Sequence, residues 1–410
     1  HQFMIFVDFT NAPALLQEAR KGLASFLGKD VSLQRVDKTH WLYWGEGEAL
    51  FLPNIQPCAS QPKATVVSPG ADAPSDEITW LKTDTILPNW LDRVLFDSLG
   101  ARHEPDWQRF EHNLDLNEDE IKIYLGTYFP RSYAEAFCIL DALLDNAAYS
   151  AVWRNKTEAS LLDVGTGTGG NLVGLLTALA KHCPALRRVI VHGFDGNALA
   201  LDAARSVLAS FASQAPFTVA LTLSANRMAS LDDLPLPDGD SYDFITTFKM
   251  GGEIVSKGGG PADEFYQRFL VSYAELLSDI GLLMLLDVTT KPEHTDFYPQ
   301  LLNAQVSRFV RSHTGFVSLV PVPCHLYETG CSEPCFTQKE FAVTHRLARN
   351  DRSRVTYRVL ARKACAQTLH ASTQVDAEYV ICAKPANDTF NTCSHSSGRG
   401  TPLDGYRISK

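Results

Sequence analysis

The stretch Leu161-Leu162-Asp163-Val164-Gly165-Thr166-Gly167-Thr168-Gly169-Gly170-Asn171 decides the fold class of this chain. An apolar run over residues 159–164 leads into a Gly-x-Gly-x-Gly turn, and an apolar helical pattern over residues 172–180 follows at once. Glycines allow positive φ angles and let a ligand lie against bare backbone, and the N-terminus of the next helix offers unpaired N–H groups. The stretch therefore predicts a ligand-binding loop between a strand and a helix.

The segments that follow continue the alternation of strand and helix. Apolar segments over residues 188–194, 242–248 and 281–288 read as strands, and helical patterns cover residues 198–211 and 264–279. This order predicts an α/β fold with a parallel sheet. Asp195 follows the second strand, where an acidic side chain is placed to accept both hydroxyl groups of a ribose.

Asp163 before the glycines, Asp195 after the second strand, and Asp243 on the strand over residues 242–248 form a series that resembles the class I S-adenosylmethionine methyltransferases, in which this strand corresponds to the fourth. The resemblance implies a Rossmann-like methyltransferase sheet that binds S-adenosylmethionine. The cofactor-binding residues that it implies are Asp163, Gly165, Gly167, Gly169 and Asp195. A nicotinamide-binding domain is the competing interpretation, but it usually has Gly-x-Gly-x-x-Gly near the start of a domain. A methyltransferase-shaped domain without a ligand is the third.

The composition is that of a globular protein with an excess of acidic residues. The 410 residues are 45% hydrophobic and 20% charged, and the net charge is −10, so any nucleic-acid contact must be local. No apolar run reaches the roughly 18 residues of a membrane span, and we expect no membrane partner. Because the chain starts at His1, we expect its natural N-terminus, with any targeting segment, to lie upstream.

Changes in composition along the chain predict three regions. Residues 1–110 form a small N-terminal α+β region, with a linker near residues 58–76, which are rich in Pro, Ser, Ala and Gly. Residues 111–322 form the methyltransferase-like domain, and residues 323–410 form a C-terminal extension. Further helices are expected over residues 78–99, 107–125, 133–146 and 296–313. Arg131 is a candidate to face the methionine carboxylate or a phosphate, with an exposed arginine at a helix start as the alternative.

Six of the nine cysteines follow residue 320, and Cys324, Cys331 and Cys335 lie within a dozen residues of irregular sequence. Cys382 and Cys393 lie in the tail. Thiolates at this density suit zinc or an iron–sulfur cluster, and the spacing alone does not separate the two metals. Free buried thiols are the alternative.

Several blocks of residues 120–410 correspond to the motifs of one family. The blocks are Tyr-Phe-Pro-Arg-Ser-Tyr-Ala-Glu-Ala (128–136), Pro-Cys-His (323–325), Cys-Phe-Thr-Gln (335–338), Arg-Val-Thr-Tyr-Arg-Val-Leu-Ala-Arg (354–362) and Glu-Tyr-Val-Ile-Cys (378–382). With the glycine-rich loop, they resemble the mitochondrial small-ribosomal-subunit methyltransferase-like family, typified by methyltransferase-like protein 17 and its yeast and bacterial relatives. Residues 1–110 lie outside the resemblance.

The resemblance implies a mitochondrial matrix protein that takes part in assembly of the small ribosomal subunit. Its expected partners are small-subunit rRNA and ribosomal proteins or assembly factors. It also implies a 4Fe–4S cluster, with zinc as the alternative metal, and the implied ligands are Cys324, Cys331, Cys335 and Cys382. The spacing between Cys331 and Cys335 is shorter than is usual in the family, and Cys393 competes with Cys382 as the fourth ligand.

A basic strip lies between the cysteines, since residues 336–365 contain eight basic and two acidic residues. Such a strip suits a phosphate backbone, with a solvated face as the alternative. The predicted RNA-binding residues are Arg346, Arg349, Arg352, Arg354 and Arg358.

No chemistry for a methyl acceptor is visible in the sequence. Residues 248–253 read Phe-Lys-Met-Gly-Gly-Glu, where amino methylases usually have a polar-Pro-Pro-aromatic motif. Cys138 and Cys183 fall on predicted helices, so neither is placed as a nucleophile. We therefore favour an assembly factor that binds rRNA and S-adenosylmethionine without known turnover, and leave open whether the chain is an enzyme. The alternative is an active S-adenosylmethionine-dependent rRNA methyltransferase. The basic strip and the cysteine loop disfavour a small-molecule methyltransferase.

Overall fold

The computed structural model describes residues 5–8, 32–35, 40–44, 81–107, 113–237, 241–291, 296–320, 336–370 and 380–381. The chain divides into two compact units, His1–Asp76 and Glu77–Lys410. In the first unit, β1 (Ile5–Asp8), β2 (Ser32–Arg35) and β3 (His40–Trp44) form an antiparallel sheet in the order β1-β3-β2. Among the described residues, no helix has the length and apolar character needed to cross a bilayer.

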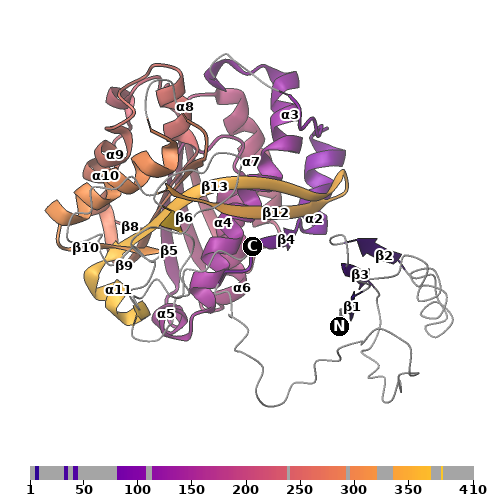
Figure 1. Cartoon of the computed structure of the whole chain (residues 1–410), viewed down its shortest axis with the longest axis horizontal. Coiled ribbons are helices and arrows are strands. Elements are labelled where there is room, and N and C mark those ends of the chain that lie inside the picture. The colour runs from indigo at the N-terminus through magenta and orange to yellow at the C-terminus, as the bar shows by residue number, and fades with distance from the viewer. Residues whose placement is uncertain are drawn as a thin grey trace. The chain divides into compact units, whose positions relative to one another are not determined.

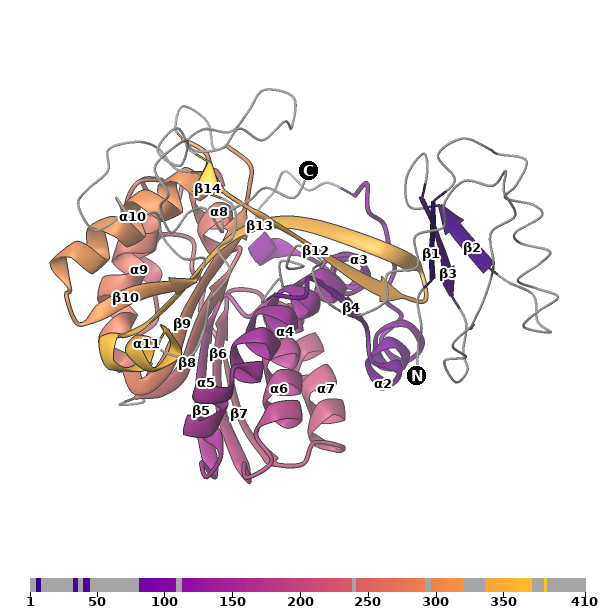
Figure 2. The same ribbon diagram turned by 60° about the horizontal axis from the view of Figure 1, so that its bottom comes forward.

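A mixed sheet forms the centre of the second unit (Figures 1 and 2). Its parallel part has the order β7-β6-β5-β8-β9, with the bounds Thr218–Ala225, Arg188–Asp195, Glu158–Val164, Tyr242–Phe248 and Leu277–Val288. The strands predicted over residues 159–164, 188–194, 242–248 and 281–288 are thereby confirmed. β7 is an edge strand that the apolar pattern did not predict, because much of its surface is only half-buried.

The long strand β13 (Ala348–Arg362) runs antiparallel to β9 and closes the parallel part of the sheet. Its other edge pairs with β10 (Phe316–Val320) near the carboxyl end and with β12 (Lys339–His345) near the amino end. β4 (Asp84–Ile86) pairs in parallel with β12. A separate short pair joins β11 (Phe336–Thr337) to β14 (Val380–Ile381).

Helices cover both faces of this sheet (Figure 2). One core contains side chains of α4 (Phe129–Asp145), α6 (Gly170–His182) and α7 (Ala198–Ala212). The other contains side chains of α8 (Met250–Ser256), α9 (Phe265–Tyr273) and α10 (Tyr298–Ser312). Leu161 belongs to the first core and Leu162 to the second, as the two-residue period of a strand requires. Two smaller helices, α5 (Ala147–Trp153) and α11 (Lys363–His370), also belong to this unit.

Three of the helices expected from the sequence have different bounds. The single helix expected over residues 78–99 is wrong, because Pro88 separates β4 from α2 (Asn89–Arg93), which the π-helical turn η1 (Val94–Ser98) continues. The helix expected over 107–125 is α3 (Glu118–Thr127), which begins at a capping box between Asn117 and Glu120. The helix expected over 264–279 ends at Tyr273, and β9 begins at Leu277.

Strand pairing also joins regions that the sequence separated. β4 comes from the expected N-terminal region, and β12 and most of the sheet's antiparallel edge come from the expected C-terminal extension. Both belong to one sheet with the strands of the central region. The sheet of the second unit therefore draws strands from all three expected regions.

Candidate functional site

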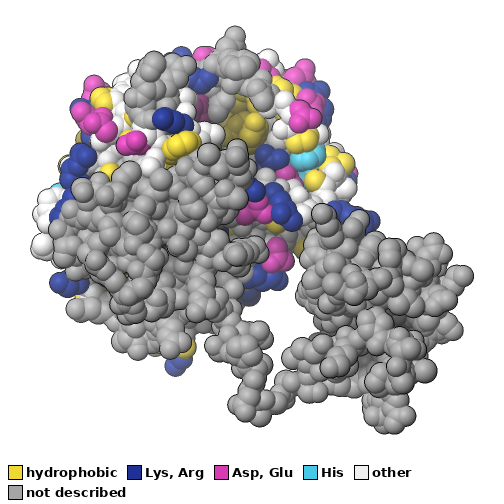
Figure 3. Space-filling view, viewed as in Figure 1, with side chains coloured by type: hydrophobic (Ala, Val, Ile, Leu, Met, Phe, Trp, Pro, Cys, Tyr) yellow, Lys and Arg dark blue, Asp and Glu magenta, His cyan; other side chains and the backbone are white. Residues whose placement is uncertain are grey.

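A cavity of about 390 Å³ opens at the carboxyl ends of the parallel strands. It lies where the strand order reverses, since β5 has β6 on one side and β8 on the other. In sheets of this kind, ligands bind at such a switch point. Figure 3 shows the described surface hollowed between α8 and α3, with hydrophobic side chains inside the hollow.

The glycine-rich loop forms one wall of the cavity. Gly165 and Gly167 line it with φ angles of 88° and 53°, which side chains rarely adopt. The backbone N–H groups of Gly165 and Thr166 both donate to the carbonyl oxygen of Phe194, at 2.8 and 3.0 Å. Gly169 does not line the cavity; it is the N-cap residue of α6.

Asp195 lies at the end of β6 and lines the cavity beside this loop. Its Oδ2 accepts a hydrogen bond from the Gly167 N–H at 2.7 Å, and its Oδ1 accepts one from the Asn197 N–H at 2.9 Å. Burial raises the pKa of Asp195 to about 6. A carboxylate oxygen can accept two hydrogen bonds, so both oxygens keep capacity for the hydroxyl groups of a ligand.

Asp163 is buried behind the loop instead of lining the cavity. Its Oδ1 accepts hydrogen bonds from Asn171 Nδ2 at 2.7 Å and from Thr246 Oγ1 at 2.6 Å. These bonds join the end of β5 to α6 and β8. In this structure Asp163 supports the loop, and burial raises its pKa to about 6.

Lys249 follows β8 and lines the cavity. It is the one non-glycine residue of the described chain with a positive φ, 64°, a conformation that costs about 1–3 kcal/mol. Its Nζ lies 2.7 Å from Oε2 of Glu135, which is fully buried on α4. Its N–H donates to the carbonyl oxygen of Leu286 at 2.7 Å. No motif in the sequence marks Lys249 as a site residue.

Residues before α4 form part of the cavity wall, although no motif in the sequence predicts them as site residues. Trp107, Leu114, Tyr124 and Tyr128 line it. The backbone N–H and the side-chain amide of Asn113 donate to the Glu253 carboxylate at 2.9 and 2.7 Å. The side-chain amide of Asn197 in turn donates to the carbonyl oxygens of Asn113 and Leu116, both at 3.1 Å. No local sequence signal marks this part of the wall, because its partners lie more than 80 residues away.

The predicted RNA-binding arginines do not form one free basic surface. Arg358 is buried at 1% exposure and donates to Asn303 Oδ1, so its prediction as an RNA contact is wrong. Arg346 pairs with Asp92 and Asp97 of α2 and η1. Arg352 and Arg354 both pair with Glu340, at 2.7 and 3.0 Å, while Arg349 is exposed.

Arg131, the candidate for an anionic ligand, pairs with Asp351 instead, with its Nη2 2.6 Å from Oδ1. The four predicted metal ligands, Cys324, Cys331, Cys335 and Cys382, lie outside the described residues, as does Cys393. Cys138, Cys183 and Cys365 are buried free thiols, and burial raises the pKa of each.

The order of the strands identifies the fold. Five parallel strands in the order β7-β6-β5-β8-β9, followed by the antiparallel β13 and then β10 on its outer edge, are typical of one class of enzymes. This strand order is that of the class I S-adenosylmethionine-dependent methyltransferase fold. β12 and β4 extend the sheet beyond this common set.

Comparisons with known proteins found similar solved structures at low sequence identity. A candidate RNA methyltransferase from Pyrococcus horikoshii shares 14% identity over 66% of this chain and 98% of that one, with a TM-score of 0.31. The plantazolicin methyltransferase BpumL, solved with SAH, has 14% sequence identity, and the match covers 67% of this chain and 96% of that one with a TM-score of 0.35. TrmN from Thermus thermophilus has 20% sequence identity, and the match covers 58% of this chain and 53% of that one with a TM-score of 0.29. No protein-family model and no curated protein matches the chain.

Proposed function

We propose that this protein binds S-adenosylmethionine in the cavity at the carboxyl ends of β5 and β6. The observation that carries the proposal is the convergence of Gly165, Gly167 and Asp195 at the switch point of the sheet. The cavity volume of about 390 Å³ falls within the range of small-molecule sites. Asp195 would hold the ribose, and the bare backbone of the loop would lie against the methionine part. When bound, the cofactor supplies an electrophilic methyl group.

Calorimetry with S-adenosylmethionine and S-adenosylhomocysteine tests this proposal. We expect one site in the full chain and a loss of affinity of about tenfold or more in Asp195→Ala, because a charged hydrogen-bond acceptor is removed. Asp202→Ala is the matched control, since Asp202 is an exposed acid on α7 that pairs with Arg205. A folded wild-type protein that binds neither compound would refute the proposal.

We propose small-subunit rRNA of mitochondria as the macromolecular partner, with assembly of the small subunit in the matrix as the role. The motif resemblance of residues 120–410 supports this proposal, and the exposed Arg349 is a starting point for an RNA contact. Co-sedimentation of the full chain with small subunits, after cross-linking in isolated mitochondria, tests it. Absence of the chain from mitochondria, or no rRNA cross-link, would contradict it.

Transfer of the methyl group to rRNA is the second candidate function, and Lys249 favours it. A strained residue that lines the cavity after the fourth strand stands where methyltransferases of this fold present their acceptor. An assay of labelled methyl transfer from S-adenosylmethionine to small-subunit rRNA tests this function. We expect Lys249→Ala to abolish the transfer. Lys181→Ala is the control, because Lys181 pairs with Asp141 on the surface of α6 and does not line the cavity.

We also propose that Cys324, Cys331, Cys335 and Cys382 hold a 4Fe–4S cluster, with zinc as the alternative. The pairing of β11 with β14 supports this ligand set, because Phe336 faces Ile381 across the pair. These two residues are the sequence neighbours of Cys335 and Cys382. Iron and sulfide analysis after anaerobic purification tests the proposal. Cys382→Ser should lose the metal while Cys393→Ser keeps it, and a folded protein without metal would refute it.

A further inference from the structure

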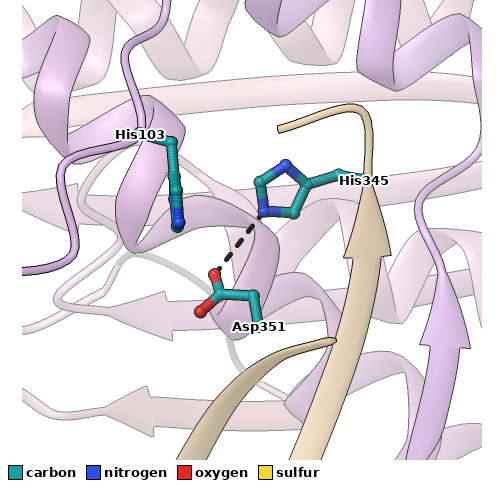
Figure 4. Close-up of side chains that lie close together, drawn as sticks. All are labelled: His103, His345 and Asp351. Atoms are coloured by element: carbon teal, nitrogen blue, oxygen red, sulfur yellow. Dashed lines mark ion pairs between the residues drawn. The ribbon is translucent and has the colours of Figure 1, made fainter. Parts of the chain in front are cut away.

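A second group of metal-ligating side chains lies apart from the cavity and from the cysteines. His103, His345 and Asp351 each offer one ligand atom, and these atoms all lie within 4.8 Å of one another (Figure 4). None of the three lines the cavity. They come from three places: the segment that follows η1, the end of β12 and the first half of β13.

The hairpin of β12 and β13 brings two of these residues together. Asp351 faces Val343 across the pair, and His345 follows Val343 by two residues on the same strand. Side chains two residues apart on a strand share a face, so His345 and Asp351 point to the same side. His345 Nε2 lies 3.6 Å from Asp351 Oδ2, and Figure 4 shows the two groups facing each other.

Contacts with α3 place His103 beside this pair. The N–H of Arg102 donates to the carbonyl oxygen of Lys122, and the N–H of Glu104 donates to Thr127 Oγ1, both at 2.9 Å. Gly126 permits this approach, because a Cβ there would lie 2.2 Å from the carbonyl oxygen of Arg102. His103 Nδ1 lies 3.1 Å from the Gly126 carbonyl oxygen, which leaves Nε2 free to act as a ligand.

The polar atoms of this group are buried without adequate partners. The His345 side chain is fully buried, and neither of its ring nitrogens has a hydrogen-bond partner. Asp351 Oδ2 is also without a hydrogen bond, although Arg131 holds Oδ1. A buried polar group left unpaired costs about 1–3 kcal/mol. Of these atoms, His345 Nε2 and Asp351 Oδ2 face each other, as two ligands of one cation would.

We propose that His103, His345 and Asp351 bind one divalent cation of the zinc type. Two imidazoles and one carboxylate are a common zinc ligand set, and bonds of about 2.0–2.2 Å place tetrahedral ligands roughly 3.4 Å apart. The spacing of His345 and Asp351 is already close to this value. Each outer contact is also of the expected kind, since the backbone carbonyl of Gly126 holds His103 and the guanidinium of Arg131 holds Asp351.

The fourth position is left for water, because His103 is only half-buried. The bound cation would tie the β12–β13 hairpin to the segment that packs on α3. This segment continues toward Trp107, which lines the cavity. The cation would therefore stabilise this part of the cavity wall as well as the hairpin.

Titration of the purified full chain with Co²⁺ tests the proposal. Cobalt bound by the cysteines gives intense sulfur-to-metal charge-transfer absorption, whereas cobalt bound by histidine and aspartate gives only weak visible bands. We expect one equivalent of cobalt without charge transfer in the wild type, and its loss in His345→Ala and in Asp351→Asn. A rise in the melting temperature on addition of Zn²⁺ should disappear in the same variants.

His182→Ala is the matched control. His182 Nε2 lies 2.8 Å from Asp141 Oδ1, a His–Asp pair for which the described residues offer no third ligand. If His345→Ala does not fold, His103→Gln removes a ligand at a half-buried position. The proposal is overturned if the wild type binds no more cobalt without charge-transfer absorption than His345→Ala or His103→Gln does. It is also overturned if His182→Ala loses as much of this bound cobalt as those variants do.

Discussion

At the scale of single residues, one aspartate lines the cavity and two buried aspartates support the segments around it. Asp163, Asp195 and Asp287 lie at the carboxyl ends of β5, β6 and β9, and burial raises the pKa of each to about 6. Their oxygens accept hydrogen bonds from the glycine loop, from Asn171 and Thr246, and from Gly252 and Tyr266. Each carboxylate therefore connects the end of a strand to the loop or helix that shapes the site.

We expect the affinity for S-adenosylmethionine to fall as the pH is lowered through about 6. The ionised form of Asp195 accepts hydrogen bonds from a ribose and the protonated form loses this capacity, and its pKa is raised to about 6 by burial. The affinity should be constant above about pH 7 and fall by up to about tenfold per unit below the pKa. Calorimetric measurement of the affinity for S-adenosylmethionine at several pH values between about 5 and 8 checks this expectation.

Asp195→Asn should remove this pH dependence along with most of the affinity. Asp163→Asn is the control, because Asp163 has a similar pKa but does not line the cavity. A pH dependence that persists in Asp195→Asn would show that another group controls binding.

At the scale of elements, the close contact of α4 with α6 positions the glycine-rich loop. Gly170 and Gly174 lie where the two helices meet. A Cβ at Gly170 would lie 2.7 Å from the Phe129 carbonyl oxygen, and one at Gly174 would lie 2.5 Å from the Tyr133 carbonyl oxygen. Because these neighbours are backbone atoms of a packed helix, they cannot move aside at low cost.

Gly174→Ala should destabilise the second unit by about 1–3 kcal/mol, since the added methyl group overpacks the contact of the two helices. Thermal or urea unfolding measures this change. Gly315→Ala is the control: it has an ordinary φ and no atom within 4 Å of the added Cβ, so its effect should stay within about 0.5 kcal/mol. Equal stability of the two variants would contradict the prediction.

In the β12–β13 hairpin, the carboxylate of Glu340 pairs with basic side chains of the same hairpin. Basic and acidic side chains lie intermixed on the described part of the face in Figure 3. Glu340 lies on β12 and pairs with both Arg352 and Arg354 on β13. Exposed ion pairs of this kind contribute little stability, so their main effect is on the surface charge.

If rRNA binds this face, Glu340→Gln should strengthen binding and steepen its salt dependence, because the face loses a negative charge and Arg352 loses its acidic partner. Binding assays across a range of salt concentrations measure both quantities. Glu264→Gln is the control, since Glu264 is an exposed acid that pairs with Arg268 on α9. Unchanged affinity and slope in Glu340→Gln would place the RNA contact elsewhere.

At the scale of the whole molecule, the chain consists of two units with separate sheets. The strands β1, β2 and β3 pair only with one another, and every described strand that lines or supports the cavity belongs to the unit Glu77–Lys410. Within the part of the chain that the structure describes, the residues that line the cavity run from Trp107 to Tyr298. Binding of the cofactor should therefore not require the first unit.

A fragment of residues 77–410 should fold and bind S-adenosylmethionine with the affinity of the full chain. Calorimetry and thermal unfolding of both proteins check this expectation. A fragment that folds but binds more weakly would assign residues 1–76 a part in the site.

The sequence by itself determined the central strands, the loop and the position of Asp195. These features are local: apolar runs of strand length, a glycine-rich turn and an acid after the second strand can be read within a few residues. The helix expected over 78–99 failed for an equally local reason, because the apolar pattern continues across Pro88. The edge strand β7 was missed because its half-buried surface weakens the apolar signal.

Only the tertiary structure decided which charges and ligands meet. Arg131 and Asp351 are 220 residues apart, and Arg346 and Asp97 are 249 apart, so no local pattern could show that these arginines are already paired. The same holds for Arg358, whose burial depends on α10 packing over β13. The group of His103, His345 and Asp351 exists because strand pairing and helix packing bring three distant segments together. The spacing of these residues in the sequence does not indicate that they lie close in space.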